Sequence, residues 1–295
     1  MSKKLKKMGY LFMIIILLPY ILTVSFNGED IMKGVSINGN TPYLTVKSDE
    51  KERKLSLEEY GIGILAREID ITYEYEVLKS QAILIRTSLY KTIQDEGSDK
   101  VHTREYWTRN QMKANWGISK YTEYYEKIRS AWSDTKGQVL LYENRLALTP
   151  YHKLSNGKTR SGKEVLGTNK YPYLKIKECK TDKESENAMT IQLIQEKNVE
   201  IQKKDKAGYV TKVKCGNDNF TGEEFRKKYH LPSSCFVLQP YENQTRVTSK
   251  GIGHGLGMSQ NYANVLALDG KKYDEILEYF FEGTQLEEVA EIIVQ

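Results

Sequence analysis

The sequence predicts an α+β fold in which a helical region packs with mixed, short-stranded β structure, preceded by one transmembrane helix. Three observations support this class. An uncharged apolar run follows a lysine cluster at the N-terminus. Apolar residues recur at helical spacing in two stretches after residue 56 and in two more near the C-terminus. Between these regions, short stretches from Ala188 to Phe236 alternate polar and apolar residues, which is typical of half-exposed strands.

The N-terminal run from Met8 to Gly28 contains no charge and is about long enough to cross a bilayer. The lysines before it should keep the N-terminus in the cytoplasm and export the remainder. A cleaved signal peptide is the alternative, but no A-x-A site follows the apolar run, which favours an uncleaved anchor. We therefore expect a single-pass protein of the cell membrane with its folded part outside.

Three parts are expected: a cytoplasmic basic tail at 1–8, a transmembrane anchor at 9–28 and an extracytoplasmic domain at 29–295. The extracytoplasmic domain is expected to contain a strand-rich lobe at about 176–240. The formal net charge is +5, and four lysines of the tail account for all but about one of it, so the remainder is nearly neutral. This excludes a basic nucleic-acid-binding domain by composition.

The spacing of cysteines and histidines indicates no metal site and no cofactor. The three cysteines and four histidines are Cys179, Cys215, Cys235, His102, His152, His230 and His254. No C-x-x-C or H-E-x-x-H occurs among them. Three cysteines permit one disulfide and one spare thiol, and the spacing leaves the pairing open.

The first helix is expected to begin after Ser56, with Glu59 completing a capping box. Leu57, Ile64 and Glu68 fall on one helical stripe. Glu68 at the helix end should therefore be partly desolvated, which raises the pKa of a carboxyl group and suits it to general acid chemistry. The alternative is a structural ion pair between Glu68 and a neighbouring arginine.

A second helix is predicted from about Tyr75 to Gln94, with Gln81 and Arg86 at the edges of its buried stripe. There they could reach a substrate hydroxyl or orient Glu68, although ordinary solvation is the alternative. Residues 134–142 are expected to form a turn into a strand, which is followed by the segment 151–159, Y-H-K-L-S-N-G-K-T. Charged residues around 180–186 indicate an exposed loop, and Thr221 opens a short helix.

Glycine occupies every second position from Gly251 to Gly257, with His254 in the middle. Alternate residues of an extended segment share a face, so one face would carry no side chain and another backbone or a ligand could approach it closely. We expect this face to form the floor of a substrate groove that also holds Glu68 and His152. Two amphipathic helices follow, one after Met258 and one at about 273–281.

Three of these segments, in this order, resemble the stage II sporulation protein D family. They are residues 57–87, the segment 151–159 and the G-x-G-H-G-x-G-M-S-Q stretch with the helices after it. The resemblance implies that Glu68 is the catalytic acid of a peptidoglycan lytic transglycosylase. It also implies a set of substrate-binding residues, which are Gln81, Arg86, His152, Ser155, His254, Ser259 and Gln260.

The resemblance implies cleavage of the bond between N-acetylmuramic acid and N-acetylglucosamine during engulfment in sporulation, with a cell-wall amidase or endopeptidase as partner. Some relatives bind zinc near the second motif, but this chain has no cysteine before Cys179, so no zinc site is expected. Two alternatives remain. The chain could be a non-catalytic glycan-binding scaffold that enhances a partner amidase, or a hydrolase that uses Asp70 or Glu74 as a second carboxylate.

Overall fold

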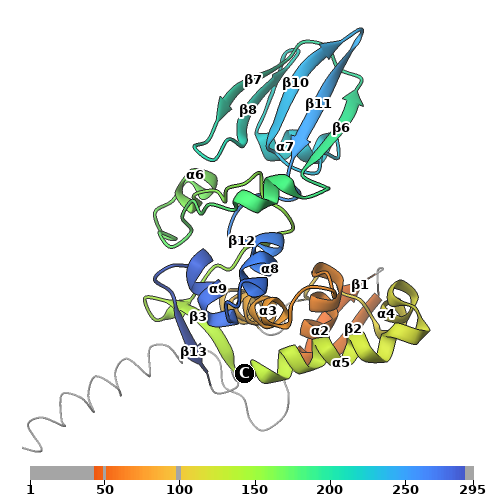
Figure 1. Cartoon of the computed structure of the whole chain (residues 1–295), viewed down its shortest axis with the longest axis vertical. Coiled ribbons are helices and arrows are strands. Elements are labelled where there is room, and N and C mark those ends of the chain that lie inside the picture. Colours follow the sequence, from red (N-terminus) through yellow and green to blue (C-terminus); the bar gives the residue numbers. More distant parts are fainter. Residues whose placement is uncertain (1–42, 49–50, 98–100, 290–295) are drawn as a thin grey trace, which may run out of the picture.

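The computed structural model of this 295-residue chain describes residues 43–48, 51–97 and 101–289. The predicted basic tail and transmembrane anchor lie outside these residues. Within the described ranges, no helix combines the length and the apolar character that a membrane span needs. The predicted α+β class is confirmed: helices and several small sheets form two lobes, drawn one above the other in Figure 1.

The lower lobe in Figure 1, here called the helical lobe, is organised around the long helix α3. Its helices are α2 (Leu57–Glu68), α3 (Tyr75–Glu96), α4 (Arg109–Trp116), α5 (Ile118–Asp134), α8 (Gln260–Leu268) and α9 (Tyr273–Phe280). Helix α3 contacts α2, α5, α8, α9 and strand β3, so it is covered on most sides. The predicted helices beginning after Ser56 and at Tyr75 are confirmed, whereas α4 and α5 were not assigned from the sequence.

Three small sheets complete the helical lobe. Their strands are β1 (Tyr43–Ser48), β2 (Lys51–Ser56), β3 (Gln138–Tyr142), β4 (Arg145–Leu146), β5 (Tyr151–His152), β12 (Met258–Ser259) and β13 (Gln285–Glu288). Strand β1 pairs with β2, and β3 lies between β13 and β4, all antiparallel. Strands β5 and β12 form a short parallel pair. This pair joins two of the motifs noted in the sequence.

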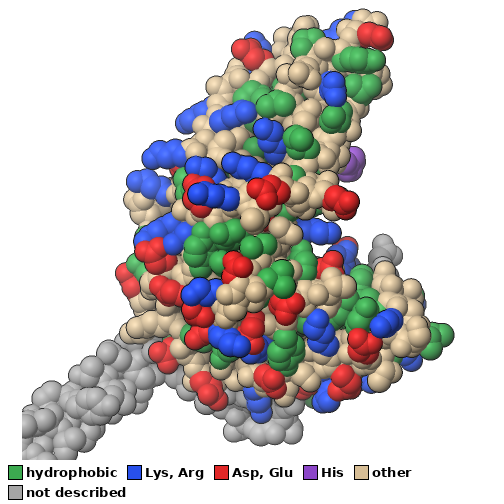
Figure 2. Space-filling model, in the orientation of Figure 1, with side chains coloured by type: hydrophobic (Ala, Val, Ile, Leu, Met, Phe, Trp, Pro, Cys, Tyr) green, Lys and Arg blue, Asp and Glu red, His purple; other side chains and the backbone are tan. Residues whose placement is uncertain are grey.

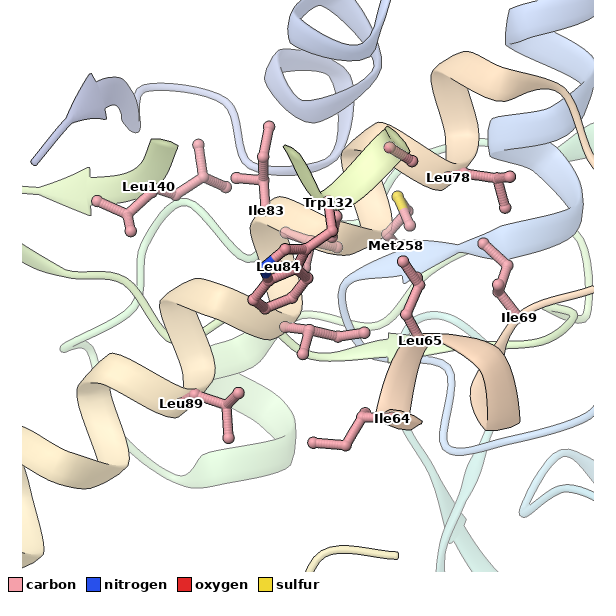
Figure 3. Close-up of a cluster of buried hydrophobic side chains, with 14 of the residues drawn as sticks. Ile64, Leu65, Ile69, Leu78, Ile83, Leu84, Leu89, Trp132, Leu140 and Met258 are labelled. Atoms are coloured by element: carbon pink, nitrogen blue, oxygen red, sulfur yellow. The ribbon is translucent and has the colours of Figure 1, made fainter. Parts of the chain in front are cut away.

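The core of the helical lobe lies between α2, α3 and α5 (Figure 3). Leu65 from α2, Leu84 from α3, Trp132 from α5 and Met258 from β12 are all buried there. A Cβ atom at Gly61 would lie 2.1 Å from the ring of Trp132, so only glycine at this position lets α5 pack so close to α2. Close packing of these helices holds the end of α2, where Glu68 lies.

The upper lobe, here called the strand-rich lobe, consists of two three-stranded antiparallel sheets and one helix. Its elements are β6 (Met189–Ile194), β7 (Val199–Lys204), β8 (Val210–Cys215), β9 (Asp218–Phe220), α7 (Gly222–Lys228), β10 (Phe236–Tyr241) and β11 (Gln244–Lys250). The sheet orders are β10-β11-β6 and β7-β8-β9. The lobe therefore runs from β6 to β11, further along the chain than the expected 176–240, because β11 pairs with both β10 and β6.

A connecting segment, residues 153–188, runs between the lobes and includes α6 (Gly162–Leu166) and a 3-10 helix, η1 (Lys180–Glu184). Arg160 of this segment is buried and binds Asp205 at 2.6 Å and Glu223 at 3.3 Å. Its backbone N–H also donates to the carbonyl of Gly255. Since a buried arginine is tolerated only when its charge is paired, these contacts define how the two lobes meet.

The glycine stretch at this junction differs from the prediction. Gly251, Gly253, Gly255 and Gly257 all have positive φ, between 72° and 112°, so the segment is not an extended strand with a bare face. A Cβ atom at Gly257 would lie 1.9 Å from the carbonyl oxygen of Pro150, and the other three would be nearly as crowded. The glycines therefore let protein groups approach closely, and they do not form the floor of an open groove.

Candidate functional site

Glu68 is the last residue of α2, and the helix is terminated cleanly at both ends. The Ser56 hydroxyl accepts a hydrogen bond from the N–H of Glu59, and the N–H of Ile69 donates to the carbonyl of Leu65. The backbone turns to an extended conformation at Ile69. The carboxylate of Glu68 projects from this end with 22% of its side chain exposed, so it is accessible to a ligand while its backbone is held rigidly.

The Glu68 carboxylate accepts hydrogen bonds from two side chains of other segments. Arg104 donates from Nε to Oε1 at 3.1 Å and from Nη2 to Oε2 at 2.7 Å, which is the bidentate geometry of strong arginine–carboxylate pairs. The Tyr151 hydroxyl, at the start of β5, also donates to Oε2. The Arg104 guanidinium lies over the Tyr151 ring, with 5.6 Å from Cζ to the centroid. Three groups from α2, the loop before α4 and β5 thus form one cluster.

The electrostatics of this cluster keep the two partners of Glu68 protonated. Burial raises the pKa of Tyr151 well above its ordinary value, and Glu68 raises it further. Burial alone would lower the pKa of Arg104, but the charge of the Glu68 carboxylate and its hydrogen bond hold this pKa above its ordinary value. The Tyr60 hydroxyl donates to the backbone carbonyl of Arg104 at 2.8 Å and fixes that loop. Both partners therefore remain hydrogen-bond donors at neutral pH.

Two glutamines hold the end of α2 from inside the lobe. Gln260 donates from Nε2 to the backbone carbonyl of Glu68 at 2.9 Å and to Oε1 of Gln81 at 3.2 Å. Gln81 is fully buried and Gln260 nearly so. Gln81 was predicted at the edge of the buried stripe of its helix, but it is fully buried because α8 also covers that side of α3. These contacts position the backbone of Glu68, and they link the C-terminal motif to the first one.

Arg86 does not contact Glu68, and it is buried where the sequence predicted the edge of the apolar stripe of α3. Its guanidinium is buried and donates to the backbone carbonyls of Thr135, Trp132 and Gln138. It stacks on the Trp132 ring at 4.3 Å, and burial lowers its pKa to about 10. Since α5 and β3 enclose it, Arg86 ties the end of α5 to α3 and does not contact the Glu68 carboxylate.

Strand β5 separates Glu68 from the two predicted histidines. Successive side chains of a strand point to opposite faces. Tyr151 accordingly reaches Glu68, while His152 turns to the other face, where its Nδ1 lies 3.2 Å from the carbonyl of Leu256. Its ring lies 5.9 Å from that of His254, and burial lowers the pKa of His152 to about 3. The structure groups the histidines with each other and not around the Glu68 carboxylate.

Ser155 and Ser259 both bind a buried carboxylate that the sequence did not indicate. Oδ2 of Asp182 accepts hydrogen bonds from the N–H and hydroxyl of Ser155 and from the hydroxyl of Ser259. Oδ1 accepts from Nδ2 of Asn261. Asp182 belongs to η1 and is fully buried, so the prediction of an exposed loop at 180–186 is wrong at its centre. The two serines anchor η1 to the loop after β5 and to β12, and their hydroxyls already have a partner.

The three cysteines, Cys179, Cys215 and Cys235, are buried and free, which answers the question that their spacing left open. Burial raises the pKa of each thiol. Across the described residues, no cluster of three or more histidine, cysteine or carboxylate side chains has a metal-binding arrangement.

Arg104, Tyr151 and Asp182 are the important residues that the sequence analysis missed. Tyr151 could have been found, because it directly precedes His152 in the second motif and must point to the opposite face. Arg104 follows a segment without periodicity, and only folding brings it to Glu68. Asp182 lies among charged residues typical of a solvated loop.

The chain that carries this site is similar to known sporulation proteins. A family model described as "Stage II sporulation protein" matches residues 47–142, which include Glu68, Gln81 and Arg104 and end before Tyr151. A stage II sporulation protein D from Bacillus subtilis (strain 168) is 30% identical over 266 residues, covering 82% of this chain and 77% of that protein. The chain belongs to the stage II sporulation protein D family. Sporulation is therefore the process with which this family is associated.

Two further relatives extend the comparison. A stage II sporulation protein D from Bacillus amyloliquefaciens is 27% identical over 324 aligned residues, which cover 93% of this chain and 93% of that protein. A protein of Bacillus subtilis (strain 168) named amidase enhancer is 22% identical over 297 residues, which cover 76% of this chain but 40% of that protein. The similarity to the sporulation proteins thus includes both lobes.

Proposed function

We propose that this protein is a membrane-anchored lytic transglycosylase that cleaves the bond between N-acetylmuramic acid and N-acetylglucosamine in peptidoglycan. The observation that carries the proposal is the Glu68 carboxylate, which is partly exposed at a rigid helix end and held by Arg104 and Tyr151. The proposal accords with membership of the sporulation protein D family.

The proposed reaction needs one carboxyl group in two roles. Glu68 in its acid form donates a proton to the glycosidic oxygen as the bond from that oxygen to C1 breaks. The resulting carboxylate then accepts the proton of the C6 hydroxyl of the muramic acid residue, whose oxygen bonds to C1. The product has a 1,6-anhydro end, the proton is returned to Glu68 and no water is consumed. Tyr151 and Arg104 stabilise the carboxylate form that exists between the two steps.

A hydrolase with two carboxylates is less well supported. Glycosidases that hydrolyse usually need a second carboxylate free to act on water or on the sugar. Asp70, the nearest candidate in sequence, accepts hydrogen bonds on Oδ1 from both the N–H and the hydroxyl of Thr72. Its carboxylate is therefore used to form a local turn.

The decisive experiment is mass spectrometry of products from purified peptidoglycan, with and without prior removal of stem peptides by an amidase. The wild-type chain should produce 1,6-anhydro ends, and Glu68→Gln should lose turnover by about 10²–10⁴-fold because an amide cannot donate the proton. Glu58→Gln is the matched control, since Glu58 is an exposed carboxylate of the same helix, and Glu74→Gln tests the hydrolase. Retention of activity by Glu68→Gln would remove the assignment, and reducing ends that also require Glu74 would establish the hydrolase.

The second candidate function is a glycan-binding scaffold that enhances a partner amidase. The similarity to a protein named amidase enhancer favours it, as does the complete pairing of the Glu68 carboxylate by two side chains. A cell-wall amidase assayed with this chain distinguishes the two. Equal enhancement by wild type and Glu68→Gln, with no anhydro ends from either, would favour the scaffold.

For localisation, we propose a single-pass anchor at 9–28 with the folded domain outside the cytoplasm. The support is the uncharged run that follows Lys3, Lys4, Lys6 and Lys7. Protease added to the outside of intact cells should digest the domain and spare the anchor. A soluble form that begins near Asn27 would show instead that the run is a cleaved signal peptide.

A further inference from the structure

A second site lies at the junction of the connecting segment and the strand-rich lobe. It is a cavity of about 290 Å³ whose charged lining residues are all lysines, namely Lys158, Lys183, Lys204 and Lys250. They come from four separate stretches, the loop after β5, helix η1, strand β7 and strand β11. Among the residues that the structure describes, no aspartate or glutamate lines this cavity. Four ammonium groups, of which only Lys158 forms an ion pair with a carboxylate of the described residues, create a positive site.

The positive charge is only partly neutralised. Lys158 binds Glu178 at 2.8 Å, and Glu178 also interacts with Lys183 at longer range. Within the described part of the chain, no ion pair joins Lys204 or Lys250 to a carboxylate. Figure 2 shows Lys and Arg side chains gathered around the base of the strand-rich lobe. Like charges brought this close repel one another, so an anion between them would be favourable.

Small and neutral residues on the cavity wall leave room for the lysine side chains. A Cβ atom at Gly157 would lie 2.1 Å from Cε of Lys183, so the glycine of the second motif makes room for this lysine. Asn156 is fixed on the wall by its bonds from Nδ2 to the Ala207 carbonyl and to Sγ of Cys235. Burial raises the pKa of Cys235, so this thiol stays neutral and adds no negative charge.

The cavity is also close to the candidate catalytic cluster along the chain. Asn156 follows Tyr151 by five residues, which limits the separation of their Cα atoms to about 18 Å even if the chain were fully extended. Tyr151 binds the Glu68 carboxylate. One oligosaccharide chain is long enough to contact both places.

We propose that this lysine-lined cavity binds an anionic group, a carboxylate or a phosphate, of the cell-wall polymer on which the protein acts. Lysine is a compact point charge that suits both ligands. The choice of a cell-wall polymer rests on the proposed function, whereas anion binding itself does not. The carboxylate would come from the lactyl group of muramic acid, and the phosphate from a phosphodiester polymer of the wall.

Binding of three probes to the full-length chain tests the proposal. N-acetylmuramic acid, inorganic phosphate and the neutral N-acetylglucosamine are titrated by NMR at low and high salt. We expect N-acetylmuramic acid or phosphate to bind, with an affinity that falls as salt rises. The triple variant Lys183→Gln, Lys204→Gln, Lys250→Gln should bind it at least about tenfold more weakly, because three charge-assisted contacts are lost.

The control is the double variant Lys214→Gln, Lys227→Gln, which removes two exposed lysines of the same lobe that do not line the cavity. It should bind like wild type. Preference for N-acetylmuramic acid over phosphate assigns the muramic carboxylate, and the reverse preference assigns a phosphodiester. Equal binding by the triple variant and wild type, or no salt-dependent binding by wild type, overturns the proposal. Loss of cleavage in Glu68→Gln with unchanged anion binding keeps the two proposals separate.

Discussion

Replacement of Gly255 by alanine tests whether the glycine stretch forms a packed junction between the two lobes. Gly255 has a φ of +77°, and an added Cβ would lie 2.4 Å from Cζ of Tyr209. The Tyr209 ring is fully buried and stacks against the Arg160 guanidinium at 4.9 Å, so it cannot move into solvent. A bare face in an open groove would tolerate the methyl group, whereas a packed junction would not.

The expected cost has two parts. An L-residue in the left-handed region costs roughly 1–2 kcal/mol relative to glycine. Forcing a methyl group into a packed interior costs about 1–3 kcal/mol more. The first cost applies at any glycine with positive φ, and the second applies only where a neighbour is too close. Gly270 isolates the first cost, because its φ is +89° and no heavy atom lies within 4 Å of its added Cβ.

Urea unfolding of the two variants, followed by far-ultraviolet circular dichroism, provides the measurement. Gly255→Ala should lower the free energy of unfolding by about 1–3 kcal/mol more than Gly270→Ala does. The change in unfolded-chain entropy is the same for both substitutions and cancels in the comparison. If the two variants are equally stable, the close contact with Tyr209 does not exist as described. A Gly255→Ala protein as stable as wild type would contradict both the close contact and the left-handed backbone at this position.

Three further outcomes are expected. Tyr151→Phe should keep its melting temperature within a few degrees but cleave glycan strands about 10–100-fold more slowly. The rate falls because the Glu68 carboxylate loses a hydrogen-bond donor and its fixed orientation. An unchanged rate would exclude Tyr151 from the site. Asp182→Ala should cost at least about 3 kcal/mol in urea unfolding, since three buried donors and one part-buried donor lose their acceptor. Exposed Glu184→Ala should cost almost nothing, and equal effects of the two substitutions would contradict the buried role of Asp182. Burial lowers the pKa of His152 from 6.5 to about 3, so between these values only the unfolded chain binds this proton. Stability should therefore fall as pH drops from 6.5 towards 3, by up to about 1.4 kcal/mol per pH unit from this residue, and His152→Asn should show a shallower fall.

The local predictions that succeeded rest on interactions between near neighbours in the chain. The Ser56 cap and the helix that Thr221 opens depend on hydrogen bonds between residues three apart, and the start of α3 followed from apolar spacing. The same kind of pattern placed Glu68 at a helix end, where the structure has it. The amphipathic helix α9 followed from apolar spacing alone.

Apart from the backbone of the glycine stretch and the bounds of the strand-rich lobe, the predictions that failed concerned which residues the rest of the protein would cover. Gln81 and Arg86 were placed at edges because a periodic stripe says only which face is most apolar, and α3 is surrounded on most sides. Asp182 was placed in solvent because its neighbours are charged, yet its own carboxylate is fully buried. Burial of a polar group is decided by partners far along the chain, and local composition does not contain them.

The sequence by itself determined the α+β class, the helix end that carries Glu68, the family and the order of its three motifs. Only the tertiary structure decided that Arg104 and Tyr151 bind that carboxylate and that His152 turns away from it on the other face of β5. It also decided that the glycines fill a lobe junction. The physical reason is distance along the chain: Arg104 and Tyr151 follow Glu68 by 36 and 83 residues, so no local pattern links them.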